Sequence, residues 1–363
     1  MKNKKKYLFG LYSEILDANS GIIKCKILGI TIRKKFNKSQ QCLTSDSQYD
    51  IDEMLCNVKQ FYNYIINHCQ SDCFNLVLHR HLGDSFVLLC LKDYFEKKYG
   101  KKLYFFVKPR QEILMKIFSI ENYTVFDITK FLDIRDYTTE TDISKTQYID
   151  KIEENLYINL FPSIPLINTP FICNPIDYIK NRCPYKNFIH GWSIMLGLDI
   201  KQVSAPKLNI KLSNEVLNKL NNIDLNKIIC FAPEANSCKE INIEFWNLLA
   251  EQLTLKGYSV IVNSVNRHNK IKFANYFNFS LYDFIAISKS AKAVFTIRSG
   301  LADILANVSK NCFVFSTEDI YQDYFYMNKI FKLPYKVNEI RINTGINSKD
   351  AKKVLNNILN QLK

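Results

Sequence analysis

Hydrophobic and polar residues in the second half of the chain follow two alternating patterns. Short apolar runs rich in β-branched and aromatic residues, typical of buried strands, occur at 227–232, 258–263, 293–297 and 312–315. Apolar residues at helical spacing occur at about 187–198, 244–256, 281–290 and from 299 onward. Strands that alternate with helices in this way predict a parallel sheet covered by helices.

The same alternation begins earlier in the chain. An apolar run at 74–79 predicts a strand, a helix is expected at about 85–99, and a second strand at 103–107. We expect these two strands to be parallel, as in a βαβ unit. Further short strands are expected at 124–128 and 157–160.

Residues 1–70 follow a different pattern, which predicts an irregular segment with a short strand at 28–32 and a helix at about 51–69. Four prolines break the stretch 163–184 and exclude long elements there. We therefore expect four parts: a basic N-terminal segment with a helix at 1–70, an N-terminal Rossmann-like acceptor domain at 71–205, a C-terminal Rossmann-like donor domain at 206–335, and a C-terminal helix that packs back at 336–363.

Composition agrees with a large globular protein. The chain has 363 residues, 47% of them hydrophobic, which is enough to bury the cores of two domains. Its 11 cysteines are irregularly spaced, and Cys90, Cys230 and Cys312 lie within apolar runs, which indicates reduced thiols and a cytoplasmic location. No apolar segment approaches the roughly 20 residues that span a bilayer.

The formal net charge of +14 predicts an anionic partner. Much of the excess lies in the first 40 residues, so we interpret the N-terminal segment as an attachment surface for anionic lipid on the inner face of the plasma membrane. Nucleic-acid binding is the alternative. We do not expect it, because the basic residues do not interleave with aromatic residues as in a recognisable nucleic-acid module.

A turn at 298–300 carries the clearest chemical signal. The apolar strand pattern stops at Arg298-Ser299-Gly300 and a helical pattern begins. A guanidinium, a hydroxyl and the free N–H groups of a helix start would meet there at the carboxyl edge of a sheet, which favours an anionic group such as phosphate. The alternative is an ordinary connection in which Ser299 caps the helix.

Two nucleotide-binding motifs are missing from the sequence. Neither unit contains Gly-x-Gly-x-x-Gly or a P-loop, so nicotinamide dehydrogenases and P-loop NTPases are disfavoured. Two Rossmann-like sheets nevertheless favour a nucleotide at their carboxyl ends. Its phosphates would then be held by isolated basic residues and helix ends.

Three motifs together resemble glycosyltransferase family 9, the lipopolysaccharide heptosyltransferases. The first is Leu-Gly-Asp at 82–84, between the expected strand and helix. The second is the segment 232–239, followed by Phe-Trp at 245–246 and a leucine-rich helix. The third is the turn at 298–300, which stands where the family has Asp-(Thr/Ser)-Gly. The resemblance covers about a third of the chain, at 74–99 and 227–315.

The chain departs from that family at the third motif. The family has an aspartate before the Ser/Thr-Gly pair and a histidine a few residues later, whereas this chain has Arg298 and, in the following helix, Asp303. This turn and the segment 28–30 also resemble capsule and surface-polysaccharide transferases. A heptose donor is therefore not implied.

The resemblance implies a GT-B fold, an α/β architecture of two facing Rossmann-like, doubly wound domains. It also implies a bacterial glycosyltransferase that moves a hexose or heptose from a nucleotide-diphosphate sugar to a lipopolysaccharide, capsule or other surface glycan, without a metal or other cofactor. Asp84 would be the general base. The residues implied for donor and phosphate binding are Lys239, Arg298, Ser299, Gly300, Glu234 and Asp303, and those for the acceptor cleft are Gly83, Arg80 and His81.

Simpler roles remain open for several of these residues. Asp84 could cap a helix that begins at Ser85, and Lys239 could be an exposed loop lysine. Arg80 could pair with a carboxylate, and Glu234 could be a turn residue. His81, with nearby cysteines at 69 and 73, also permits a zinc site, although the spacing is irregular. A catalytically inactive, glycan-binding scaffold is the remaining functional alternative.

Overall fold

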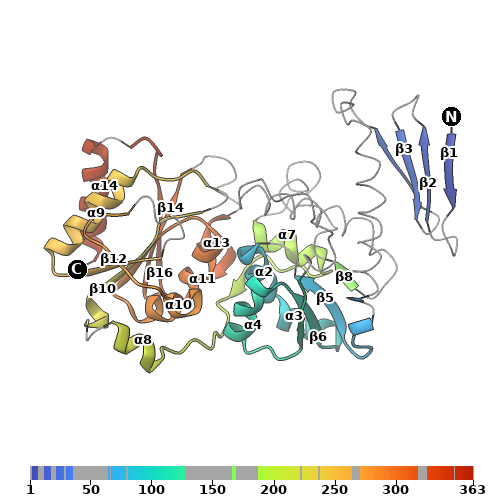
Figure 1. Ribbon diagram of the computed structural model, residues 1–363, viewed down its shortest axis with the longest axis horizontal. Coiled ribbons are helices and arrows are strands. Elements are labelled where there is room, and N and C mark those ends of the chain that lie inside the picture. The colour runs from blue at the N-terminus through green and yellow to red at the C-terminus, as the bar shows by residue number, and fades with distance from the viewer. Residues whose placement is uncertain are drawn as a thin grey trace. The chain divides into compact units, whose positions relative to one another are not determined.

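The computed structural model describes residues 2–6, 12–17, 22–27, 30–35, 64–65, 67–78, 81–127, 166–168, 187–220, 223–235, 238–263, 270–317, 325–346 and 348–362. The protein is a mixed α/β structure with parallel sheets (Figure 1). Its backbone contacts divide it into two compact units. One contains 1–77, 104–106 and 126–171, and the other contains 78–103, 107–125 and 172–363.

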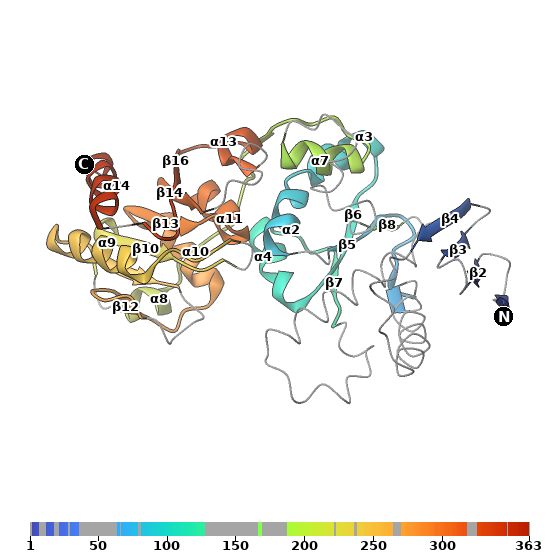
Figure 2. The ribbon, with the colours of Figure 1, turned by 90° about the horizontal axis from the view of Figure 1, so that it is seen from above.

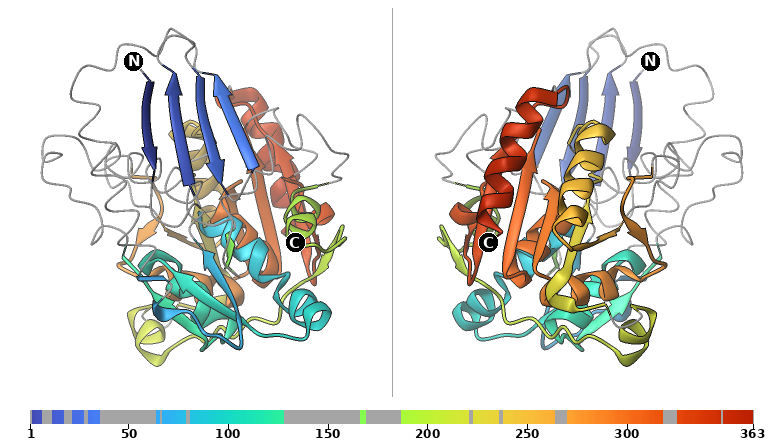
Figure 3. Two further views of the ribbon diagram at one scale, coloured as in Figure 1. Left: turned by 90° about the vertical axis from the view of Figure 1, so that its right-hand side faces the viewer. Right: turned by 90° about the vertical axis from the view of Figure 1, so that its left-hand side faces the viewer.

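The first unit begins with a regular antiparallel sheet, so the expected irregular segment is wrong there. Four strands pair in chain order and are visible side by side in Figure 3: β1 (Lys2–Lys6), β2 (Tyr12–Asp17), β3 (Ile22–Ile27) and β4 (Ile30–Lys35). Each strand pairs with the next along its full length. Apolar and polar residues alternate over 23–27 in β3 and over 30–33 in β4, a pattern that suits strands better than loops.

A second sheet follows in the chain. It contains β6 (Leu103–Val107), β5 (Phe74–Leu78) and β8 (Leu166–Asn168), which lie side by side in this order. The strands expected at 74–79 and 103–107 are thereby confirmed, and their apolar residues are mostly buried. The strand expected at 157–160 lies outside the described residues.

The second unit is built on a six-stranded sheet in which each strand runs parallel to its neighbours. Its order is β12-β11-β10-β13-β14-β16. The four strands expected in this part of the chain are confirmed, and two strands at the sheet edges add to them. The bounds are β10 (Ile228–Ala232), β11 (Ser259–Val262), β12 (Asn275–Tyr276), β13 (Ala293–Ile297), β14 (Asn311–Ser316) and β16 (Lys336–Arg341).

Helices α9 (Ile243–Leu255) and α14 (Ser348–Gln361) pack against each other, and both lie beside the sheet in Figure 3. They share one hydrophobic core with the sheet. Aromatic residues fill much of this core. The rings of Phe295 and Phe313 stack with centroids 4.6 Å apart, and Phe231 contacts Trp246 at 5.1 Å. Aromatic side chains bury large areas, so this cluster holds the sheet firmly beneath the loops at its edge.

The helices expected at 187–198, 244–256, 281–290 and from 299 are confirmed in position, and three shorter helices among the described residues of this unit were not expected. The helix expected at 85–99 is wrong as a single element, because the chain forms α2 (Leu82–Leu89) and α3 (Lys92–Tyr99) with a break at Cys90 and Leu91. The apolar run of α2 is buried, whereas α3 is mostly polar. The other helices are α4 (Glu112–Phe118), α7 (Phe188–Met195), α8 (Asn214–Lys219), α10 (Leu281–Ser290), α11 (Gly300–Val308) and α13 (Met327–Ile330).

Short elements complete this unit. They are the strands β7 (Tyr123–Val125), β9 (Val203–Ser204) and β15 (Phe331–Lys332), and the 3₁₀ turns Pro109–Gln111 and Leu225–Lys227. Cys90, Cys230 and Cys312 are free and buried, as expected. Among the residues described, no helix combines the length and apolar character needed to cross a bilayer.

Candidate functional site

The strand order of the six-stranded sheet contains a switch point. The chain adds β11 and β12 on one side of β10, and then returns to add β13 and β14 on the other side. The connections after β10 and β13 therefore leave the sheet in opposite directions. In open parallel sheets, ligands bind at such a point, outside the carboxyl ends of the strands. The segments that follow Ala232 and Ile297 are thus the candidate ligand loops.

The turn after β13 has the predicted strand, turn and helix geometry. β13 ends at Ile297, and α11 begins at Gly300. Ser299 is the N-cap, and its hydroxyl accepts a hydrogen bond from the Ala302 amide at 3.3 Å. The capping role is therefore present, and the remaining N–H groups of the first helical turn lie at the sheet edge.

Arg298 has an anionic partner within the protein. Two guanidinium nitrogens lie 3.1 Å from the two carboxylate oxygens of Asp303. The guanidinium also donates to the backbone carbonyls of Phe325 at 3.2 Å and Ser299 at 2.9 Å, and it lies over the Phe325 ring. Its side chain is only 13% exposed. Arg298 is consequently a fixed, largely buried charge at the base of the turn.

Asp303 is a buried carboxylate in the first turn of α11. It is 2% exposed. Burial raises its pKa to about 6, against the attraction of Arg298, and the nearby carboxylates of Asp84 and Glu339 raise the pKa further. A carboxylate that is this buried and turned toward a guanidinium is poorly placed to contact a ligand.

Two glycines bring the start of α2 against the start of α11. A β-carbon added at Gly300 would lie 2.4 Å from the Gly83 nitrogen, and one added at Gly83 would lie 2.5 Å from the Gly300 Cα. The two helices accordingly pack side by side (Figure 2). Only residues without a side chain permit this approach. The two glycines therefore join the first and third motifs at one place.

Asp84 belongs to this junction, but not as a helix cap. It lies in the first turn of α2, half-buried, whereas the N-cap position is occupied by His81. The helix begins three residues earlier than expected because packing against α11 outweighs the capping preference of Ser85 and Asp84. A carboxylate in the first turn of a helix is stabilised in its charged form by the helix dipole.

The structure offers less support for the other residues expected in the acceptor cleft. His81 is exposed and its side chain makes no capping hydrogen bond. Arg80 lies outside the described residues. Cys69 and Cys73 are partly buried free thiols. Within the described part of the chain, no three His, Cys, Asp or Glu residues are grouped so that they could hold a metal ion.

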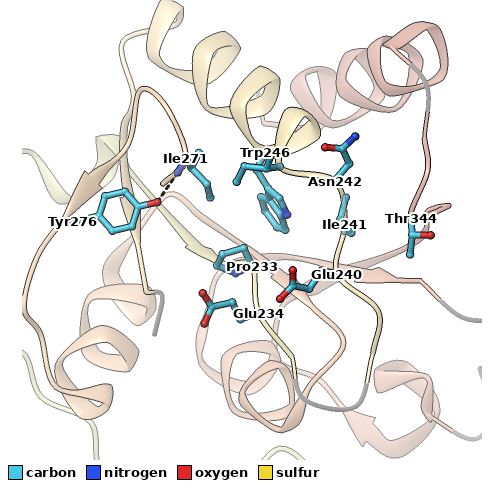
Figure 4. A pocket seen from close by; sticks show the side chains of 10 residues that line it. Pro233, Glu234, Glu240, Ile241, Asn242, Trp246, Ile271, Tyr276 and Thr344 are labelled. Carbon is cyan, nitrogen blue, oxygen red and sulfur yellow. Dashed lines mark hydrogen bonds between the residues drawn. The ribbon is translucent and has the colours of Figure 1, made fainter. Parts of the chain in front are cut away.

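The loop after β10 borders a pocket of about 320 Å³ at the start of α9 (Figure 4). Its lining combines two carboxylates with aromatic and apolar side chains: Pro233, Glu234, Glu240, Ile241, Asn242, Ile243, Trp246, Ile271, Tyr276 and Thr344. Glu234 is half-buried there, and Lys239 is exposed on the same loop. The structure thus places Glu234 at a cavity of a size that could hold part of a small molecule.

Sequence reasoning missed most residues of this pocket. Tyr276 accepts a hydrogen bond from the Ile271 amide at 2.7 Å, as Figure 4 shows, and burial is the main cause of its raised pKa. Thr344 follows β16, far away in the sequence. No local motif marks either residue, because they reach the pocket only through the order of strands in the sheet. Asn242 was detectable as a helix N-cap, since its side chain accepts from the Glu244 amide.

The proposed site residues fall into two groups. Gly83, Asp84, Arg298, Ser299, Gly300 and Asp303 meet at the junction of α2 and α11. Glu234 and Lys239 lie on the loop after β10. Both groups border the switch point of the sheet.

Comparison with known proteins supports the fold. No protein-family model and no curated sequence matches the chain significantly. Among solved structures, the ADP-heptose lipopolysaccharide heptosyltransferase II of E. coli is 12% identical, with a TM-score of 0.54, and the match covers 80% of this chain and 98% of that chain. The E. coli heptosyltransferase WaaC with ADP is 13% identical, with a TM-score of 0.51, and the match covers 80% of this chain and 99% of that chain. The chain has the GT-B type of α/β fold.

The glycine junction yields a direct prediction. Gly300→Ala places a methyl group within 3 Å of the backbone of α2, so either the two helices separate or the backbone shifts. We expect the free energy of unfolding to fall by about 1–3 kcal/mol, measured by urea denaturation. Gly345→Ala is the control, because the nearest atom would lie 3.8 Å away. Equal stability of the two variants would contradict the close contact.

Proposed function

We propose that this protein is a glycosyltransferase that moves a sugar from a nucleotide-diphosphate sugar to a hydroxyl group of a surface glycan or glycolipid, such as lipopolysaccharide or capsule. The observation that carries the proposal is a half-buried carboxylate, Asp84, held against the switch-point turn of a GT-B fold. The similarity to two heptosyltransferases, over nearly their whole length, supports it.

The donor would bind at the two loops of the switch point. The exposed Lys239 and the N–H groups at Ser299 and Gly300 would bind the diphosphate, whose charge also suits the start of α11. Arg298 would act through its positive charge from beneath the turn, because its donors already point to Asp303 and to carbonyl groups. Glu234, at the pocket, would accept hydrogen bonds from hydroxyl groups of the ribose or the sugar.

Asp84 would be the general base. It would take the proton of the acceptor hydroxyl while the oxygen forms a bond to the anomeric carbon, and the bond from that carbon to the diphosphate oxygen breaks. Such a single displacement inverts the configuration at the anomeric carbon. The negative charge of the departing diphosphate would be stabilised by Lys239 and the N–H groups of the turn, without a metal ion. Asp303 is too deeply buried for the same task.

The donor base is tested by ligand-induced stabilisation. We expect one of UDP, GDP, ADP and CMP, or its sugar derivative, to raise Tm of the wild type selectively. Lys239→Ala should remove most of that shift, whereas Lys256→Ala, on an exposed residue after α9, should retain it. Asp84→Asn should keep the shift but lower transfer at least 100-fold, because it keeps the shape and removes the base.

Two results would contradict this assignment. The absence of any selective nucleotide shift would remove the donor site and favour a different ligand class. Full activity of Asp84→Asn in cells that depend on the protein would favour a scaffold that binds glycan without catalysis, since a scaffold does not need the base.

The N-terminal sheet offers a surface for attachment to an anionic membrane. Its register pairs Lys4 with Ile15, Ile15 with Lys24, and Lys24 with Arg33, so these positions share a face. Seven basic residues fall on that face together with a single acidic residue, Asp17: Lys2, Lys4, Lys6, Lys24, Lys26, Arg33 and Lys35. Such a concentration of charge suits anionic lipid headgroups at the cytoplasmic side of a membrane.

Matched substitutions on the two faces of this sheet test the attachment. Lys4→Gln with Lys24→Gln removes two charges from the basic face, and Lys5→Gln with Lys34→Gln removes two from the other face. At about 1 kcal/mol per charge, the first pair should lower the affinity for phosphatidylglycerol vesicles about 30-fold, as measured by sedimentation. The second pair should lower it much less. Equal effects would contradict a role of the face. Tighter binding to RNA than to vesicles would favour the nucleic-acid alternative.

A further inference from the structure

The junction of α2 and α11 contains a charged pair that direct substrate contact does not explain. Arg298 and Asp303 are joined by two nitrogen–oxygen contacts of 3.1 Å, and their side chains are 13% and 3% exposed. Taking both charges out of water costs more than an ordinary ion pair returns. A pair that is retained at such a cost is a candidate for a positioning role.

The Asp303 carboxylate lies against two helix starts. It belongs to the first turn of α11, and its Oδ2 atom would be 2.9 Å from a β-carbon on Gly83, in the first turn of α2. His81, the N-cap of α2, makes no side-chain capping bond. A negative charge is favourable at the positive end of a helix. The Asp303 carboxylate is therefore a counter-charge for α2 as well as for its own helix.

We propose that Asp303, held by Arg298, is a positioning residue for Asp84. The inference rests on the proposed function, in which Asp84 is the general base. Asp84 is the residue after Gly83, so the contact that places Gly83 also places the Asp84 carboxylate. The guanidinium balances the charge of Asp303, and Asp84 itself is only half-buried, so part of its surface is accessible to an acceptor hydroxyl.

The charges around Asp303 give the positioning role a pH signature. Three charged groups shift the pKa of Asp303: Arg298 after β13, Asp84 on α2 and Glu339 on β16. Asp303 in turn contributes to the raised pKa of the buried Cys90 thiol. The pKa of Asp303 is raised to about 6, mainly by burial. Below that pH the carboxylate gains a proton and its attraction to Arg298 weakens. Transfer should accordingly decline as the pH falls through about 6.

Kinetics of three variants test the proposal. Asp303→Asn keeps the shape but removes the charge, the double variant Arg298→Gln with Asp303→Asn removes both charges, and Asp283→Asn is the control at the first turn of α10. We expect Asp303→Asn to lower kcat at least 10-fold, to change KM for the nucleotide sugar less than about 2-fold, and to lose the decline near pH 6. The control should keep wild-type values.

A second measurement needs no substrate. The Ser85 amide donates a hydrogen bond to the His81 carbonyl at the start of α2. Hydrogen exchange of the α2 amides at 85–89 should be at least 10-fold faster in Asp303→Asn than in wild type. If Asp303→Asn does not fold, the double variant takes its place in both measurements.

The outcomes separate this inference from the proposed function. Wild-type kcat and an unchanged pH profile in Asp303→Asn would overturn the positioning role, and so would α2 exchange equal to that of wild type. A parallel rise in KM and fall in kcat would also overturn it, because that result assigns Asp303 to donor binding. If the wild type transfers no sugar at all, the proposed function fails, and α2 exchange alone decides whether Asp303 holds the helix.

Discussion

One buried carboxylate lies at the centre of the junction between α2 and α11. Asp303 forms the ion pair with Arg298 and lies in the first turn of α11, against the first turn of α2. Two positive helix ends and a guanidinium thus lie around the Asp303 carboxylate, and two glycines allow the backbones to touch. This arrangement fixes the turn after β13 and the place of Asp84 at the same time.

The unusual sequence of the turn has a physical meaning in this arrangement. Glycosyltransferase family 9, which the sequence resembles, has an aspartate at the position of Arg298. The charge at this position therefore has the opposite sign in this chain, which is a departure from the family's donor site. The structure places a carboxylate at Asp303, which compensates for that change of sign within the protein. The guanidinium lies below the turn in this ion pair and does not reach outward as a direct ligand.

Much of the fold was predictable from the sequence because local pattern and burial agree there. The strands at 293–297 and 312–315 and the helix at 281–290 are apolar segments with clear ends, and Ser299 and Ser280 cap the helices that follow them. The start of α2 was not predictable, since the contact between Gly83 and Gly300 joins residues more than 200 positions apart. Tyr276 and Thr344 were missed for the same reason. The N-terminal sheet was not predicted, because apolar and polar residues alternate over only a few positions in its short strands and these strands are rich in lysine.

A nucleotide diphosphate bound at the switch point of the six-stranded sheet would contact the two loops that leave β10 and β13. Its binding is best measured by hydrogen-exchange mass spectrometry of the wild-type protein, with and without the nucleotide diphosphate that stabilises it. We expect slower exchange in the segments 238–242 and 299–303 when the nucleotide is present. Slower exchange confined to other parts of the chain, with these segments unchanged at saturating nucleotide, would contradict binding at the switch point.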